Sequence, residues 1–148
     1  MSNVLVRRGD WVVVCDGKKA LVLENVGDTK FLNLKAREVH EQPDAKTREQ
    51  GTDAPGRSIN SIDSRRSAME QTDWHEQEED RFLRKLADRL DAAVNAGLVK
   101  SLILIAPPRA LGVLRQTYSH NLRAAVRAEI DKDFVKLPVH AIEKHLAE

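Results

Sequence analysis

The sequence predicts a single α/β domain, residues 1–148, built around a mixed five-stranded sheet. Two observations support this fold class. Short β-branched runs separated by tight turns fill the first forty residues, which is typical of antiparallel strands. Beyond residue 73, helical and strand-like segments alternate, which is typical of parallel βαβ units. A chain of 148 residues is long enough to bury a substantial core in one domain.

Three strands are expected in the N-terminal part. Trp11–Cys15 is a continuous apolar run, the pattern of a strand that is buried on both faces. Asp16 and Gly17 follow at once as a hairpin signal. Residues 20–24 should therefore return antiparallel to the first strand, and residues 31–39 should complete a three-stranded meander.

One long helix is expected next. Phe82, Leu86, Leu90 and Val94 recur at every fourth position and form one apolar stripe on a helix of roughly six turns. Asp73 is a suitable N-terminal cap, with Glu76 three residues later, and Gly97 suits a left-handed C-terminal cap.

The remaining elements alternate. The apolar run 101–106 predicts a central strand, and a helix should open at Pro108. A short helix over 119–125, a fifth strand over 126–130 and a last helix from Pro138 should follow. A meander followed by βαβ units is the layout of the ribonuclease H-like group of α/β folds.

Residues 41–73 are predicted to form a long polar loop between the third strand and the first helix. The stretch contains Pro43, Gly51, Pro55 and Gly56 and shows no apolar periodicity. Because both flanking segments belong to one sheet, a linker between domains is a poor description. A loop of this length is typical of either a mobile segment or a functional one.

The net charge, the cysteine count and the lack of long apolar runs indicate the partners and the location to expect. The formal net charge is +1, so the whole chain gives no general attraction to nucleic acid or membrane. The single cysteine, Cys15, lies in an apolar run and is expected to be a buried hydrophobe. No secretory signal or membrane-spanning run is visible. We therefore expect a cytoplasmic protein with no membrane partner.

Asp16 is one candidate for chemistry, because nucleases with this sheet layout place a metal-binding carboxylate at the end of the first strand. Asp131 and Asp133, near the end of the fifth strand, are placed to approach it. A two-metal site needs several converging carboxylates, and the central strand ends at Ala106 without one. The hairpin already explains Asp16, so we predict no metal site.

His75 and Trp74 lie at the expected start of the long helix. A histidine there can serve as a general base, and a tryptophan can stack on a nucleobase. The alternative, which we favour, is that Trp74 packs on the sheet and His75 is an ordinary surface residue.

Arginines form a further candidate site, a phosphate-binding rim at the carboxyl end of the sheet, where ligands of open α/β sheets bind. The alternative is that neighbouring carboxylates pair with them, and both interpretations stay open. The arginines are Arg48, Arg57, Arg65, Arg66 and Arg109.

Several segments together resemble the bacterial family of proteins required for attachment to host cells. The segments are Trp11 to Gly17, Thr47 to Arg57, Asp73 to His75, Ala106 to Arg109 and Asp131 to Asp133. The resemblance covers nearly the whole chain. For a chain with cytoplasmic features, it implies an indirect role in attachment.

The element order is also similar to the middle domain of eukaryotic and archaeal class-one release factors. In those proteins the loop after the third strand carries a Gly-Gly-Gln tip that enters the peptidyl-transferase centre. This chain lacks that tripeptide, and Gln50-Gly51 is its nearest approach. The resemblance implies a ribosome, tRNA or other RNA as partner.

Three functions remain. The first is a translation- or RNA-associated binding module that presents residues 41–73. The second is a hydrolase that acts on RNA or peptidyl-tRNA-like esters through Gln50 or His75. The third is a protein-interaction module, with protein partners, that attachment needs indirectly. None of them is expected to need a cofactor.

Overall fold

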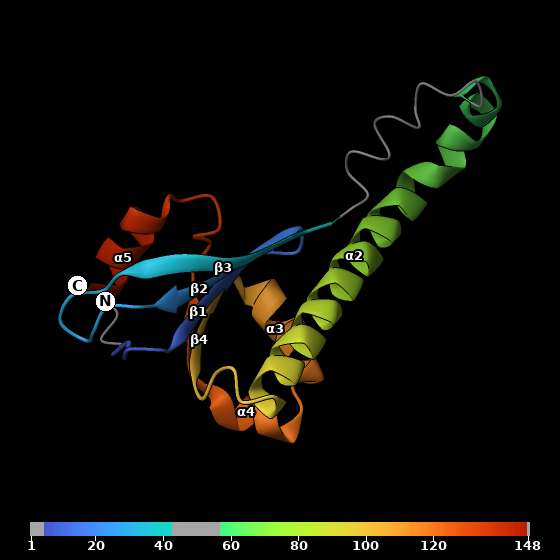
Figure 1. Cartoon of the computed structure of the whole chain (residues 1–148). Coiled ribbons are helices and arrows are strands. Elements are labelled where there is room, and N and C mark those ends of the chain that lie inside the picture. Colours follow the sequence, from blue (N-terminus) through green and yellow to red (C-terminus); the bar gives the residue numbers. More distant parts are fainter. Residues whose placement is uncertain (1–4, 43–56, 148) are drawn as a thin grey trace.

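The computed structural model describes residues 5–42 and 57–147, with side chains for 5–42 and 74–147. Five strands form one open mixed sheet in the order β3-β2-β1-β4-β5 (Figure 1). The strands are β1 Trp11–Cys15, β2 Lys19–Asn25, β3 Leu34–Glu41, β4 Leu102–Ala106 and β5 Val126–Asp131. The helices are α2 Arg57–Asn95, α3 Pro108–Thr117, α4 His120–Ala125 and α5 Val139–Ala147. The predicted mixed five-stranded α/β architecture is confirmed.

The central strands are those with the most apolar sequences. β1 pairs antiparallel with β2 and parallel with β4, and β4 pairs parallel with β5. All five residues of β1 and all five of β4 are buried. Strands buried on both faces need apolar side chains on both, which is why these two runs do not alternate with polar residues.

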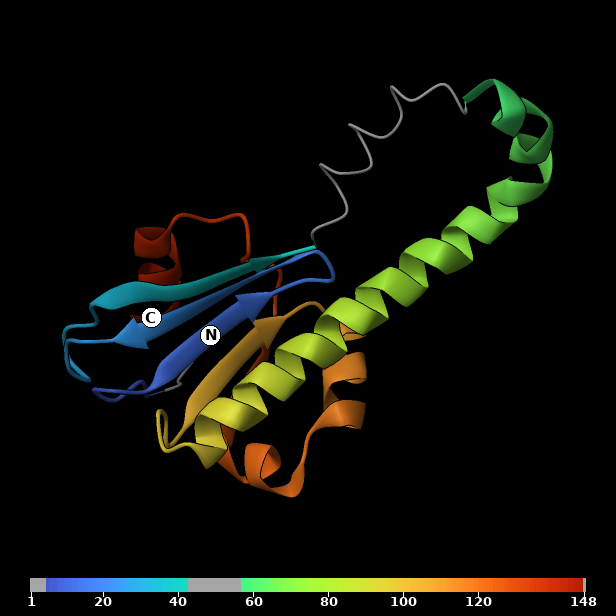
Figure 2. The ribbon, with the colours of Figure 1, turned by 45° about the vertical axis from the view of Figure 1, so that its right-hand side comes forward.

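Two apolar cores lie on opposite faces of the sheet. Helices α2, α3 and α4 cover one face, and α5 covers the other (Figure 2). Trp11, Val13 and Cys15 face the core formed with α2, α3 and α4. Val12 and Val14 face the core formed with α5. None of the helices in the described ranges is long and apolar enough to cross a membrane.

The helix after β3 is longer than predicted. α2 begins at Arg57, so residues 57–73 of the predicted loop are helical and Asp73 lies inside the helix instead of capping it. Pro55 and Gly56 precede Arg57, and neither residue type occurs between 57 and 73. A helix nucleated on the core can propagate through polar sequence until such a breaker, which explains the difference.

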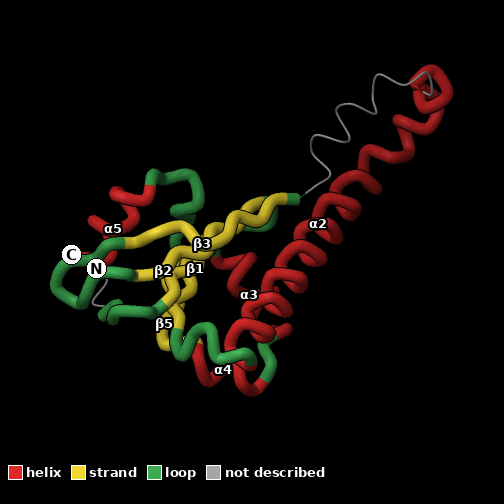
Figure 3. The backbone as a smooth tube through the Cα atoms, viewed as in Figure 1, coloured by secondary structure: helices red, strands yellow, loops and turns green. Residues whose placement is uncertain are grey.

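The N-terminal part of α2 projects beyond the sheet, away from the body, and its outermost turns bend away from the axis of the rest of the helix (Figures 1 and 3). The rest of the predicted loop, residues 43–56, lies outside the described residues. At its other end α2 stops as predicted. Gly97 has a φ of 78°, and Leu98 N donates to Ala93 O at 3.0 Å. These features form a left-handed helix cap.

A buried polar network fastens the chain where β1, β4 and β5 begin. The Asp10 carboxylate is only 6% exposed and accepts hydrogen bonds from Arg7 N, Ser101 Oγ and Arg127 Nη1 at 2.7–2.9 Å. Because buried carboxylates are costly without partners, these three donors make the position tolerable.

Asn25 completes this network at the end of β2. Its side chain is fully buried, and its Nδ2 donates to the carbonyls of Val6, Arg7 and Asp28 at 3.2–3.3 Å. Its Oδ1 accepts from Gly27 N and Asn33 N, both at 3.0 Å. One amide thereby holds the segment before β1 against the β2–β3 connection.

Glu38 and Arg89 connect β3 to α2. The Arg89 guanidinium donates through Nε and Nη2 to both carboxylate oxygens of Glu38, with Nε–Oε1 at 3.1 Å. This pairing, with a weaker contribution from His40, lowers the pKa of Glu38 from 4.5 to about 2 against the opposing effect of burial. The pair is partly exposed, so solvent screening reduces its contribution.

We predict that Asn25→Ala lowers the free energy of unfolding by about 2–4 kcal/mol, because several buried backbone groups lose their partner. Asn33→Ala is the matched control, since Asn33 is exposed and takes part through its backbone. Its free energy should stay within about 0.5 kcal/mol of the parent. Urea unfolding followed by circular dichroism measures both, and equal losses would contradict the assignment.

We also predict an acid-dependent loss of stability centred on Glu38. The folded pKa is depressed, so its stabilisation is present above about 4.5 and is lost as pH falls toward 2. Glu38→Gln should lack this component, which we expect to be about 1–2 kcal/mol after screening. Unfolding free energies of parent and Glu38→Gln should therefore converge below pH 4.5. Glu41→Gln, at an exposed position, should keep the parent's pH dependence.

Candidate anion-binding site

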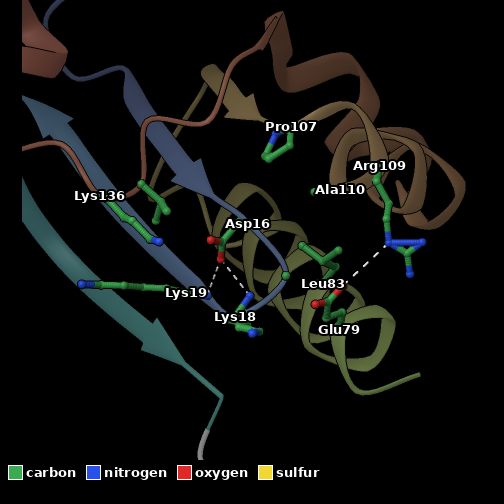
Figure 4. Close-up of a pocket in the computed structure, with 11 residues that line it drawn as sticks. Asp16, Lys18, Lys19, Glu79, Leu83, Pro107, Arg109, Ala110 and Lys136 are labelled. Atoms are coloured by element: carbon green, nitrogen blue, oxygen red, sulfur yellow. Dashed lines mark hydrogen bonds and ion pairs between the residues drawn. The ribbon is translucent and has the colours of Figure 1, made fainter. Parts of the chain in front are cut away.

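A pocket of about 400 Å³ lies at the carboxyl ends of β1 and β4 (Figure 4). Four parts of the chain line it: the β1–β2 turn, the middle of α2, the start of α3 and the segment after β5. β4 continues into α3 on one face of the sheet, whereas β5 leads to α5 on the other. Such a divergence at the carboxyl ends of parallel strands is where open α/β sheets bind ligands.

Asp16 forms one wall of the pocket and is used in the hairpin turn. Its Oδ1 accepts hydrogen bonds from Lys18 N and Lys19 N, both at 2.8 Å. The turn is held to the end of β3 as well, since Gln42 Nε2 donates to Gly17 O at 2.9 Å. The described chain before residue 43 therefore ends beside the pocket.

Gly17 is required by the closeness of α2. A Cβ at this position would lie 2.7–2.9 Å from the side-chain carbons of Glu79. Its φ is not positive, so the hairpin signal correctly located the turn while the glycine serves close approach. The contact sets how near α2 comes to the sheet at the pocket.

Arg109, in the first turn of α3, is paired within the protein. Its Nε lies 3.7 Å from Glu79 Oε1 and its Nη2 lies 3.5 Å from Asp80 Oδ1. The Asp80 atom is buried and has no well-aligned hydrogen bond, so the contact with Arg109 is a long ion pair. For Arg109 the structure thus gives the internal pairing that the sequence left open.

Lys18 and Lys136 carry the positive charge of the pocket that no described acidic side chain pairs with. Four cationic and two acidic side chains line it, a net charge of +2. Neither Lys18 nor Lys136 has an acidic partner among the side chains that the structure describes, whereas Lys19 lies 3.9 Å from Glu41. The start of α3 has no side-chain cap. Because Pro108 has no backbone N–H, the donors that α3 offers to an anion are the N–H groups of Arg109 and Ala110.

The other predicted site residues lie apart from this pocket. Trp74 is 47% exposed and His75 is exposed, both on α2. Trp74 therefore does not pack on the sheet as favoured above. Arg57, Arg65 and Arg66 belong to the projecting part of α2, and their side chains are outside the described set, as are residues Arg48 and Gln50 altogether.

No carboxylate cluster accompanies Asp16. Asp131 and Asp133 are exposed and do not line the pocket. Within the described ranges, no group of three or more His, Cys, Asp or Glu side chains is placed to hold a metal ion. Cys15 is buried, and burial raises its pKa to about 12, so its thiol remains protonated at neutral pH.

Sequence reasoning missed Lys18, Glu79 and Lys136. Lys18 occupies the tip of a predicted hairpin, and the position of the turn is the one signal that pointed to it. Glu79 and Lys136 come from elements far apart in the chain. Their convergence depends on how α2 and the segment after β5 pack, which no local pattern encodes.

A family model described as "Protein required for attachment to host cells" matches residues 11–146. No curated protein matches the chain. The matched range includes every element of the sheet and the pocket at its carboxyl edge.

We predict that Gly17→Ala destabilises the protein by about 1–3 kcal/mol, because the new Cβ overlaps Glu79 and forces the side chain and α2 to shift. Gly112→Ala is the matched control. It has nothing within 4 Å of the added atom and should be neutral or stabilising by up to about 1 kcal/mol. Thermal unfolding of both variants measures the difference; a neutral Gly17→Ala would contradict the close contact.

Proposed function

The chain belongs to the family of proteins required for attachment to host cells, and we propose that it acts there as a non-enzymatic module that binds single-stranded RNA. The cationic pocket at the carboxyl edge of the sheet is the observation that carries the proposal. Lys18 and Lys136 would take a phosphate together with the first turn of α3. Lysine ammonium groups and helix N-termini both favour phosphate.

An extended ligand fits the surroundings of the pocket better than a small isolated anion. α2 leads outward from the pocket wall and carries the exposed Trp74, whose ring offers a stacking surface for a base. Further out, Arg57, Arg65 and Arg66 lie on the same helix. A phosphate chain starting at the pocket would follow this direction. RNA in the cytoplasm, free or on the ribosome, is the expected ligand.

We also propose that the sheet is related to those of ribonuclease H-like folds. The strand order β3-β2-β1-β4-β5, with β2 running opposite to its neighbours, supports it. From the resemblance to release factors we take one further element of the proposal, that the segment after β3 has a functional role. Peptide release is not part of the proposal, because the chain lacks the Gly-Gly-Gln tripeptide.

The two alternatives have less support. A hydrolase would need activated groups, yet Asp16 is bonded within its turn and His75 stands on an exposed helix face. A protein-interaction module is favoured by one observation, the projection of α2 beyond the sheet (Figure 1). It predicts a bound protein that survives nuclease treatment of the lysate.

Binding of a fluorescent oligouridine, followed by anisotropy at several salt concentrations, tests the RNA proposal. Lys18→Glu plus Lys136→Glu should weaken binding at least about tenfold at low salt. Loss of two phosphate contacts should also reduce the slope of log affinity against log salt by about 1.4, since each contact on a single strand contributes about 0.7.

The matched control is Arg8→Glu plus Lys100→Glu, the same change of charge at the opposite edge of the sheet. It should leave RNA binding unchanged. Arg65→Glu plus Arg66→Glu tests whether the RNA extends along α2. If it does, this variant should weaken RNA binding in the same way as the pocket variant. An absence of binding by the parent, or an equal loss in the control, would sink the proposal.

A further inference from the structure

The edge of the sheet opposite the pocket carries most of the exposed apolar side chains. Three segments meet there, residues 5–10, 26–33 and 96–101, which we call the loop edge (Figures 2 and 3). Of six large apolar side chains exposed in the described part of the chain, four belong to it. They are Leu5, Val26, Phe31 and Leu98.

The three segments are held together as one surface. Asn25 bonds the carbonyls of Val6 and Asp28, which joins the first segment to the second. Ser101 Oγ donates to Asp10 Oδ1 at 2.7 Å, which joins the first to the third. The four exposed apolar side chains, which we call the apolar tips, are therefore carried by segments that are fixed relative to one another.

Cations accompany these tips. Arg7, Arg8, Lys30 and Lys100 are exposed on the same segments, against one exposed acid, Asp28, for a net charge of +3. The other acid, Asp10, is buried and bound to Arg127, and it also lies 3.9 Å from Arg7 Nε. A hollow of about 590 Å³ lies between residues 7–10 and 97–101. Arg7, Arg8 and Lys100 line it together with two acids, the buried Asp10 and Glu24, which is paired with Arg37.

We propose that the loop edge binds the surface of an anionic phospholipid bilayer. Separate apolar tips gain free energy by entering the acyl boundary, and nearby cations are attracted to anionic headgroups. Phe31 is 71% exposed and Leu98 is 50% exposed, so both have surface to bury on insertion. Arg8 and Lys100, which line the hollow and have no acidic partner among the described side chains, bind headgroup phosphates.

Other occupants fit the surface less well. The core of a protein interface is depleted of charged residues, whereas here exposed cations lie on the same segments as the apolar side chains. RNA would gain from aromatic stacking, yet three of the four apolar side chains are aliphatic. A fluid headgroup layer accommodates separate tips and cations together.

A membrane partner was not expected from the sequence, because the net charge is +1 and no segment is both long and apolar. The loop edge gathers its residues from three distant segments. This inference is independent of the proposed function, which uses the opposite edge.

Co-sedimentation of the full chain with sucrose-loaded vesicles tests the inference. We expect binding to vesicles of phosphatidylcholine mixed with phosphatidylglycerol, little binding to phosphatidylcholine alone, and weakening by salt. Phe31→Ser plus Leu98→Ser should lower the apparent affinity at least about tenfold, because two apolar side chains no longer enter the boundary. Arg8→Glu plus Lys100→Glu should do the same through charge.

Val39→Ser plus Lys132→Glu is the matched control, with an exposed apolar residue and an exposed lysine changed outside both the loop edge and the pocket. It should bind vesicles as the parent does, and circular dichroism should show all variants folded. Absent binding to phosphatidylglycerol vesicles overturns the inference, as does an equal loss in the control. Oligouridine binding that depends on Arg8 and Lys100, without vesicle binding, would assign the edge to RNA instead.

Discussion

The buried carboxylate of Asp10 is the constraint on which the sheet depends most directly. It bonds Ser101 immediately before β4 and Arg127 at the second residue of β5, while its own backbone carbonyl accepts from Asn25 N at the end of β2. Parallel strands cannot be aligned by a tight turn, because long connections separate them. A shared buried acceptor at their starting ends supplies that alignment, and the register carries through to the pocket at their far ends.

The strands could be predicted from the sequence because their information is local. Burial on both faces requires an uninterrupted apolar run, and the two central strands have one. The start of α2 was not predictable in the same way. Asp73 has the chemistry of a cap, but a cap residue ends a helix only where the backbone before it turns away. Here the preceding polar residues continue the helix back to Arg57.

The candidate site could be predicted in part. Asp16 and Arg109 were found from strand ends, and both line the pocket. The sequence alone could not show which cationic side chains of the pocket are paired with acidic ones. Arg109 is compensated by Glu79 and Asp80 from another helix, whereas Lys18 and Lys136 are left to set the sign of the pocket. Such balances arise from tertiary packing, in which residues far apart in the chain become neighbours.

The projecting helix also has a mechanical consequence. The C-terminal half of α2 packs on the sheet, and Glu79 lies against Gly17 of the β1–β2 turn and Arg109 of α3. From Glu79 to Arg57 the path along the helix is about 33 Å at 1.5 Å per residue, and its outermost turns bend (Figure 2). A rotation of about 10° near Glu79 would displace the outer end by up to about 6 Å, by the geometry of a lever of this length. A ligand that changes the Arg109–Glu79 contact would therefore act where a small rotation of α2 becomes a large displacement of its outer end.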